Sequence, residues 1–174
     1  MKEDNVRFRN LIILGDYGYV SREKISEFER EFHINLPKLY VNLIMRHNSP
    51  WCEQDCFEYY GLNNEITVSS FSFKGFETEL SSSSLENIFA QYIYDDPVYG
   101  YEHVYSFGSS ADGNFICFDY RGEPTGDEPK ICIVIHDEYD EETGKHLLFP
   151  VADNFEEFLD GLKTFDEIMA KYEE

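Results

Sequence analysis

The chain has 174 residues, of which 42% are hydrophobic and 17% aromatic, with 15 Phe and 13 Tyr. This length predicts one domain spanning residues 1–174, and the aromatic content argues against intrinsic disorder, which requires low hydrophobicity as well as high charge. The 35 acidic residues outnumber the 14 basic ones, and the net charge is -21. Such a surface repels nucleic acids and anionic membranes and attracts basic proteins, although acidity can also serve solubility alone. We therefore expect no nucleic acid and no membrane partner.

The N-terminal segment is charged where a secretory signal would be apolar. It reads Met1-Lys2-Glu3-Asp4-Asn5, and the apolar run that follows at 11–14 is short. No stretch approaches the roughly 20 apolar residues of a membrane span. The sequence therefore predicts a soluble, cytoplasmic protein.

The cysteines fall into two settings. Cys117 and Cys132 lie within apolar runs, where a free thiol behaves as a small buried hydrophobe. Cys52 and Cys56 are spaced more widely than the cysteines of a zinc knuckle, and no second pair follows. His47 is near enough in sequence to supply a third ligand, so a metal site is the alternative to reduced thiols. We expect reduced thiols, with no metal and no cofactor.

Two helices joined by a tight bend are predicted between residues 21 and 48. Ser21 is a favourable N-cap, and Val20 can pack against Ile25 across the first turn. Pro37 suits the first turn of the second helix, where its missing N–H costs no hydrogen bond. Apolar residues at helical spacing give each helix one buried stripe. These are Ile25, Phe28 and Phe32, then Tyr40, Leu43 and Ile44.

The middle of the chain is predicted to be β structure followed by a third helix. Strands are expected at 57–62 and 66–73, and Trp51 is expected in the core. Residues 81–84 form a polar connector that is too short to separate two domains. Ser84 is a candidate N-cap for a helix with apolar residues at helical spacing, namely Leu85, Ile88, Phe89, Tyr92 and Ile93.

The most distinctive stretch is 107–120, where a turn of Gly, Ser and Asp runs into apolar residues and ends at an acid. The turn residues supply the positive φ angles that a tight reversal needs. The apolar run at 115–118 is too short for a helix and too apolar for a strand with one solvated face, which predicts a strand buried on both faces. A second run at 131–135 is expected to pair with it.

The remaining elements complete an α+β pattern. An acidic loop is expected at 136–144, and a short strand at 147–149 is expected to end at Pro150. Asp153 is predicted to cap a last helix, with Glu156 at the spacing of a capping box. Helices at both ends of the chain with strands between them predict an α+β fold with a mostly antiparallel central sheet.

No residue pattern indicates catalysis. Ser109 and Ser110 lack the Gly-x-Ser-x-Gly elbow and a neighbouring His. The glycines Gly108 and Gly113 precede neither a Lys nor a helix, which a phosphate-binding loop requires. The carboxylates at 137–142 lack the spacing of a calcium loop, so a solvated charge run is expected there. We therefore expect that the protein is not an enzyme.

Three blocks of residues follow one another between about residues 21 and 162. The first is I-x-x-F-E-x-x-F-x-I-x-L-P-x-x-Y-x-x-L-I-x-x-x-N from Ile25 to Asn48. The second is Y-x-F-G from Tyr105 with D-G-N-F-I-C-F-D ending at Asp119, and the third is V-A-D-N-F-E-E-F-L from Val151. In this order they resemble the SUKH superfamily, which includes the fungal cell-wall-assembly regulators and many bacterial immunity proteins.

The resemblance implies a SUKH-like fold and a function in binding. Bacterial members typically bind and neutralise a cognate toxin, often a nuclease, delivered by neighbouring cells. The net charge of -21 fits such a partner independently, because nucleases that bind phosphates usually carry basic surfaces. We therefore expect a non-enzymatic immunity protein for a basic toxin domain, acting as a monomer or weak homodimer. The alternative is a regulatory interaction module that scaffolds other proteins without inhibiting a toxin.

The candidate contact surface is the acidic segment at 137–142 together with the acids of the preceding loop. Between residues 123 and 142 the acids far outnumber the single Lys, Lys130. Tyr139 is a natural aromatic anchor, and the alternative for the carboxylates is a solvated loop. The predicted contact residues are Glu123, Asp127, Glu128, Asp137, Glu138, Tyr139, Asp140, Glu141 and Glu142.

Overall fold

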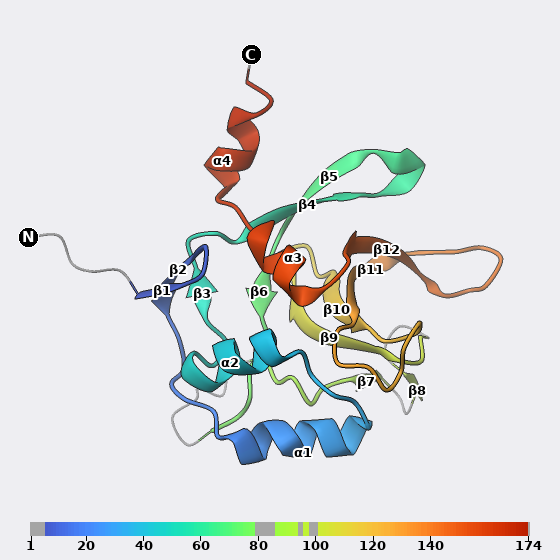
Figure 1. Cartoon of the computed structure of the whole chain (residues 1–174). Helices are drawn as coiled ribbons and strands as arrows, with labels where there is room; N and C mark the ends of the chain where they lie inside the picture. The colour runs from blue at the N-terminus through green and yellow to red at the C-terminus, as the bar shows by residue number, and fades with distance from the viewer. Residues whose placement is uncertain (1–5, 79–85, 94–95, 98–100, 174) are drawn as a thin grey trace, which may run out of the picture.

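The computed structural model describes residues 6–78, 86–93, 96–97 and 101–173 and has an α+β architecture (Figure 1). Its centre is an antiparallel five-stranded sheet with the order β12-β11-β10-β9-β6. The helices flank it in sequence as α1 (Arg22–Phe32), α2 (Lys38–Arg46), α3 (Phe155–Asp160) and α4 (Phe165–Ala170). The predicted fold class, with helices towards both ends of the chain, is therefore confirmed.

The central sheet is a meander with one added edge strand. Its members are β9 (Val104–Ser109), β10 (Phe115–Asp119), β11 (Lys130–Tyr139), β12 (His146–Ala152) and β6 (Ser72–Phe73). Phe115 pairs with Val134 and Asp119 with Lys130, which confirms the predicted pairing of the two apolar runs. Smaller antiparallel sheets contain β1 (Val6–Phe8), β2 (Leu11–Gly15) and β3 (Trp51–Cys52), β4 (Cys56–Tyr60) with β5 (Ile66–Ser70), and β7 (Tyr92–Ile93) with β8 (Asp96–Pro97).

The bend between α1 and α2 is held by one glutamate. Ser21 caps α1 as predicted, because its hydroxyl accepts a hydrogen bond from a backbone N–H of the first turn at 3.2 Å. His33 ends the helix in the left-handed region, with φ of 55°. Glu29 accepts the Leu36 N–H at 2.8 Å and pairs with Arg22 at 2.9 Å. The glutamate in the middle of α1 therefore ties the chain after the bend back to the helix.

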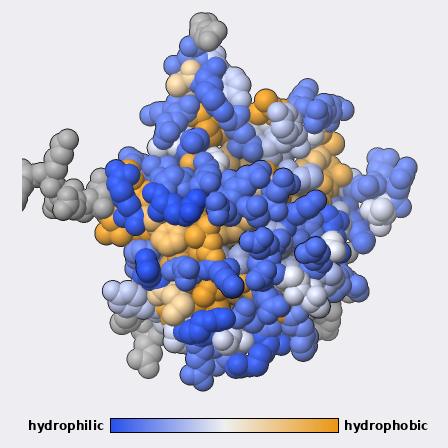
Figure 2. All heavy atoms as spheres, in the orientation of Figure 1, coloured by the Kyte–Doolittle hydropathy of each residue, from blue (hydrophilic) through white to orange (hydrophobic). Residues whose placement is uncertain are grey.

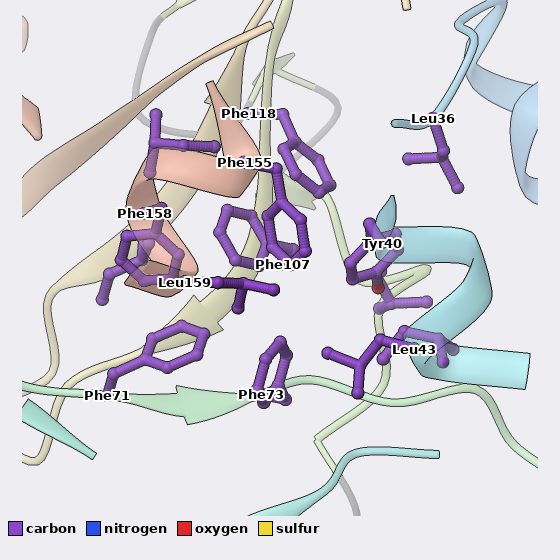
Figure 3. Packing of buried hydrophobic residues seen from close by; sticks show 14 of the residues in the cluster. Leu36, Tyr40, Leu43, Phe71, Phe73, Phe107, Phe118, Phe155, Phe158 and Leu159 are labelled. Carbon is purple, nitrogen blue, oxygen red and sulfur yellow. The ribbon is translucent and has the colours of Figure 1, made fainter. Parts of the chain in front are cut away.

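An aromatic cluster joins the sheet to α2 and α3. Phe107 of β9 stacks on Phe118 of β10 with ring centroids 4.2 Å apart. Tyr40 of α2 meets Phe118 edge-on at 5.1 Å and Phe155 of α3 at 5.4 Å. Figure 3 shows these rings converging from the sheet and the two helices, and all of them are buried. Edge-to-face contacts of this kind stabilise the core beyond the burial of apolar area alone.

Strand β10 is buried on both faces, as predicted. Ile116 and Phe118 belong to the main core, whereas Cys117 belongs to a smaller cluster with Val104 and Val134. Cys117 lies opposite Cys132 in the β10–β11 register, and both thiols are free. The alternation of successive side chains between the two faces of a strand explains why one apolar run contributes to both clusters.

Two predicted elements in the middle of the chain are wrong. The strand expected at 66–73 is divided between two sheets, because Phe71 leaves the ladder and packs on Phe158 at 5.0 Å. The helix expected from Ser84 is absent from residues 86–93, since the backbone of Gly75 forms 2.9 Å hydrogen bonds to Glu86 and Ile88 and holds them in a bridge. The predicted connector at 81–84 lies outside the described residues.

Predicted boundaries near the C-terminus also shift. Pro150 lies inside β12 rather than after it, which is allowed because β12 is an edge strand that does not need every N–H. Asn154, not Asp153, caps α3 by accepting a backbone N–H at 2.8 Å. Helix α3 ends at Gly161. Thr164 then caps the start of α4 in a capping box with Glu167.

Replacement of Gly108 by Ala is expected to destabilise the fold. Gly108 lies in β9 rather than in the turn, and a Cβ there would lie 2.3 Å from the Phe71 ring and 2.6 Å from the Ser72 carbonyl oxygen. Overpacking of this kind costs about 1–3 kcal/mol. The matched control is Gly122→Ala, which meets nothing within 4 Å and should change stability by less than about 0.5 kcal/mol. Urea unfolding of both variants measures the difference, and equal stabilities would contradict the packing.

Replacement of Tyr40 by Phe is expected to stabilise the protein. The Tyr40 hydroxyl is buried and has no hydrogen-bond partner among the described residues. Burial raises the pKa of this phenol, because the charged form cannot be solvated there. An unsatisfied buried hydroxyl costs about 1–3 kcal/mol, which its removal recovers while the ring contacts remain. A lower free energy of unfolding for Tyr40→Phe, measured by the same urea titration, would show that the hydroxyl is bonded in solution.

Candidate protein-binding surface

The predicted contact residues of the loop between β10 and β11 are held in place by the α1–α2 bend. Tyr120 is buried, and its hydroxyl donates a hydrogen bond to the Asn35 carbonyl at 2.6 Å. The Asn35 side-chain amide donates in turn to the Thr125 carbonyl at 3.1 Å. This bracing presents three exposed acids, Glu123, Asp127 and Glu128, which we call the loop surface.

A groove of about 640 Å³ opens beside the loop surface. Arg121 forms two 2.9 Å hydrogen bonds to the Asp119 carboxylate, which neutralises that acid. No Lys or Arg among the described residues forms an ion pair with Glu123, Glu128 or Asp153. The groove therefore has a net negative lining, which includes Asp119, Arg121, Glu123, Glu128, Lys130 and Asp153.

A smaller groove of about 280 Å³ adjoins the first one. Asp127 and Glu128 line it from the loop, Pro37 from the start of α2 and Glu156 from α3. Glu128 lines both grooves, so the loop surface lies where they meet. Asp153 and Glu156 were not among the predicted contacts. In the sequence they are visible only as helix-start acids, and the packing of α3 beside the β10–β11 loop brings them to this place.

The other predicted contact residues lie on the hairpin between β11 and β12. The acidic loop expected at 136–144 is wrong in part, because β11 continues to Tyr139 and the reversal follows it. Asp140 shapes the reversal by accepting the Glu142 N–H at 2.8 Å. The Tyr139 ring is 57% exposed and packs against His146 at 4.4 Å. We call these residues the hairpin surface, which consists of Asp137, Glu138, Tyr139, Asp140, Glu141 and Glu142.

The structure places the loop surface and the hairpin surface at opposite ends of β11. The strand has 10 residues, so a rise of about 3.3 Å per residue separates its ends by up to roughly 30 Å. Between them the Tyr101 ring forms cation–π contacts with Arg121 and Lys145, whose charged groups lie 5.4 Å and 5.1 Å from the ring centroid. The predicted contact residues therefore form two acidic surfaces rather than one, and their role in binding stays a prediction.

These surfaces are suited to attract a basic protein from a distance. Individual exposed ion pairs contribute at most about 1 kcal/mol, but an array of like charges raises the local potential and steers an oppositely charged partner. Salt screens such attraction beyond roughly 8 Å at physiological ionic strength. The arrangement therefore favours fast, salt-sensitive association with an oppositely charged partner.

Trp51 is exposed, and the prediction that it lies in the core is wrong. Its side chain is 49% exposed on β3, where it pairs with Gly15 and meets the Tyr17 ring edge-on at 5.6 Å. The indole occupies the space that a side chain at Gly15 would need, since a Cβ there would lie 2.1 Å from it. Figure 2 shows apolar atoms gathered on the visible face around this small sheet and α2. The sequence around Trp51 does not show that Gly15, which is distant in the chain, leaves space for the indole at the surface.

The residues of the alternative metal site do not converge. His47 Nδ1 bonds the Asp16 carboxylate at 2.7 Å, and Cys56 Sγ bonds the Asp55 carboxylate at 3.5 Å. Cys52 lies in β3. Over the ranges that the structure describes, no group of three His, Cys, Asp or Glu side chains is arranged to hold a metal ion.

The thiols of Cys52 and Cys56 are expected to react slowly in the native protein. Burial, with a contribution from the charge of Asp55, raises the pKa of Cys52 to about 12 and of Cys56 to about 11. Because the thiolate is the nucleophile and an unfolded cysteine has a pKa of about 8.5, iodoacetamide at pH 8 should label native Cys56 roughly a hundredfold more slowly than the urea-unfolded chain. Cys52 should react more slowly still. Peptide mass spectrometry measures both rates, and similar rates in the two states would contradict this protection.

Comparison with known proteins identifies the family. No curated protein and no solved structure matches the chain. Within the described residues, no helix has both the length and the apolar character needed to cross a membrane. The family model described as SMI1 / KNR4 family (SUKH-1) matches residues 19–161, a range that contains α1 to α3, the central sheet and both acidic surfaces. The chain therefore belongs to the SMI1/KNR4 (SUKH-1) family, within the SUKH superfamily.

Proposed function

We propose that the chain is a non-enzymatic immunity protein of the cytoplasm that binds and neutralises a basic toxin domain of the nuclease type. The observation that carries this proposal is the pair of acidic surfaces at the two ends of β11. Their exposed carboxylates have no Lys or Arg ion-pair partner among the described residues. Membership of the family supports a function in protein binding.

Inhibition follows from occupying a basic surface. A nuclease binds phosphates through Lys and Arg side chains, and carboxylates placed on those side chains exclude the substrate by charge and by bulk. Two acidic surfaces separated by up to roughly 30 Å can contact two edges of a domain-sized partner at once. No group on this chain then has to perform a chemical step.

A regulatory module without toxin inhibition is the second candidate. The observation that favours it is the exposed Trp51 together with Tyr19, which is 78% exposed and follows two residues after the Tyr17 ring that contacts Trp51. Trp and Tyr are enriched at the centres of protein interfaces, and these two lie outside both acidic surfaces. A scaffold would use such a surface for a further protein, and it would not protect cells from a toxin.

The proposed function is tested with the basic toxic domain of a secreted protein encoded beside this chain. The wild-type protein should protect cells that express the domain, and its association rate should fall at least about tenfold between about 50 mM and 500 mM salt. Neutralising the loop surface with Glu123→Gln, Asp127→Asn and Glu128→Gln should slow association about tenfold or more.

A matched control removes the same number of charges from α1. Glu23, Glu27 and Glu31 are exposed on α1, and their replacement by Gln should change the association rate by less than about threefold. If both triple variants slow association equally, only the net charge matters and the loop surface is not the contact. If cells that express the wild-type chain die like controls, the immunity function is wrong.

A further inference from the structure

A second concave surface lies away from the loop surface, between the β4–β5 hairpin, β12 and the end of α4. It is a groove of about 390 Å³ lined by Tyr59, Tyr60, Ile66, Val151 and Tyr172, among others, and we call it the hairpin groove. This volume falls in the roughly 300–1,000 Å³ range of ligand pockets. Figure 1 shows the β4–β5 hairpin projecting from the body of the protein, and Figure 2 shows apolar atoms exposed along it.

The apolar lining of the hairpin groove is accessible. Tyr60 is 58%, Ile66 53% and Tyr172 54% exposed. Tyr60 and Ile66 lie opposite each other in the β4–β5 register, so they form one cross-strand pair at the rim. Large apolar side chains gathered around a hollow mark interaction sites more often than single exposed ones do.

The walls of the hairpin groove are fixed in relation to one another. The Glu58 carboxylate of β4 accepts hydrogen bonds from Lys171 and from the Tyr172 hydroxyl, which attaches the end of α4 to the hairpin. The backbones of Cys56 and Lys163 exchange hydrogen bonds of 3.0 Å and 2.8 Å, which anchors the start of β4 beside the chain that enters α4. A ligand would therefore meet a preformed surface, which lowers the entropy cost of binding.

The charges around the hairpin groove are negative. The Ala111 N–H donates a hydrogen bond to the Ser70 hydroxyl of β5 at 2.9 Å, which brings Asp112 beside the β4–β5 hairpin. Glu138 belongs to the hairpin surface, and its strand β11 pairs with β12, whose Phe149 packs against Tyr59 at 6.0 Å. In keeping with this placement, burial raises the pKa of the Tyr59 phenol, and the charges of Asp112 and Glu138 raise it further. The Lys171 cation in the lining is already bound to Glu58. An apolar hollow with acids on the neighbouring segments fits an apolar side chain flanked by Lys or Arg.

The free edge of β12 does not favour the addition of a strand. Pro150 lies in the hairpin groove and in β12, where it has no N–H to donate to an incoming backbone. The Tyr59 ring also packs against Phe149 of the same strand at 6.0 Å. Recognition in the groove therefore depends on side chains rather than on a new β ladder.

We propose that the hairpin groove receives an aliphatic anchor side chain from a Lys- or Arg-rich segment of the basic partner. This inference rests on the proposed function and names the second contact of that interface. The acidic surfaces would speed the encounter, and the groove would slow dissociation by burying the anchor. Such a division is common, because charges act mainly on association while buried anchors act on residence time.

The test uses the full chain and two synthetic peptides, one alternating Lys with Leu and one alternating Lys with Ala. The Lys–Leu peptide should bind at least about tenfold more tightly, a difference of about 1.4 kcal/mol. Its NMR chemical-shift changes should centre on Tyr60, Ile66 and Val151. Equal affinities, no binding of either peptide, or shift changes centred elsewhere would overturn the proposal.

Variants distinguish binding in the hairpin groove from attraction by the acidic surfaces. Ile66→Asn should reduce the preference for the Lys–Leu peptide to less than about twofold, and Tyr172→Ala should lower it in the same direction. Leu14→Asn is the matched control, because Leu14 is 62% exposed on β2, and it should leave the preference unchanged. If Ile66→Asn also leaves it unchanged while neutralised acids abolish binding of both peptides, the groove is excluded and the acid-driven function stands. Loss of toxin protection in cells tests that function separately.

Discussion

The stacking of Phe107 on Phe118 at 4.2 Å is the contact around which the rest of the protein is arranged. It aligns β9 with β10. Tyr40 of α2 and Phe155 of α3 pack against this pair of rings. Each fully buried ring contributes on the order of 1.5–3 kcal/mol. Because Gly108 follows Phe107 without a side chain, Phe71 and β6 can approach the same strand. The central sheet, α2, α3 and the edge strand β6 therefore meet at one pair of rings.

The length of β11 sets the distance between the loop surface and the hairpin surface. Its first half, Ile131 to Ile135, is buried, whereas the residues after it are exposed. The apolar half anchors the strand in the core, and the polar half extends into solvent as a hairpin. Acids that precede the strand and acids that end it are thus held apart on a rigid support. Part of the acidity behind the net charge of -21 is then presented as separate surfaces, which lowers their mutual repulsion and leaves each one available to cations.

Charge and apolar area would have different parts in the proposed binding. Exposed carboxylates attract a partner over a distance but contribute little once they are hydrated and screened. The hairpin groove, with the rims of Tyr60 and Ile66 and the floor of Tyr59, offers burial that does not depend on salt. Both features lie on elements that are tied to the core by hydrogen bonds, so neither has to be ordered when a partner binds.

Local signals in the sequence determined the α1–α2 pair, the strands at 115–118 and 131–135 and the family pattern, because caps, turns and apolar runs act over a few residues. Ser21 and the Phe107–Phe118 segment illustrate this, since their signals lie within one element or one turn. Only the tertiary structure decided that residues 86–88 bridge to Gly75, that Gly15 exposes Trp51, and that β11 separates the acids. The contact of Glu58 with Lys171 likewise joins residues 113 apart in the chain. Such outcomes depend on which residues distant in the chain provide space or a hydrogen-bond partner. A short stretch of sequence does not show which distant residues these are.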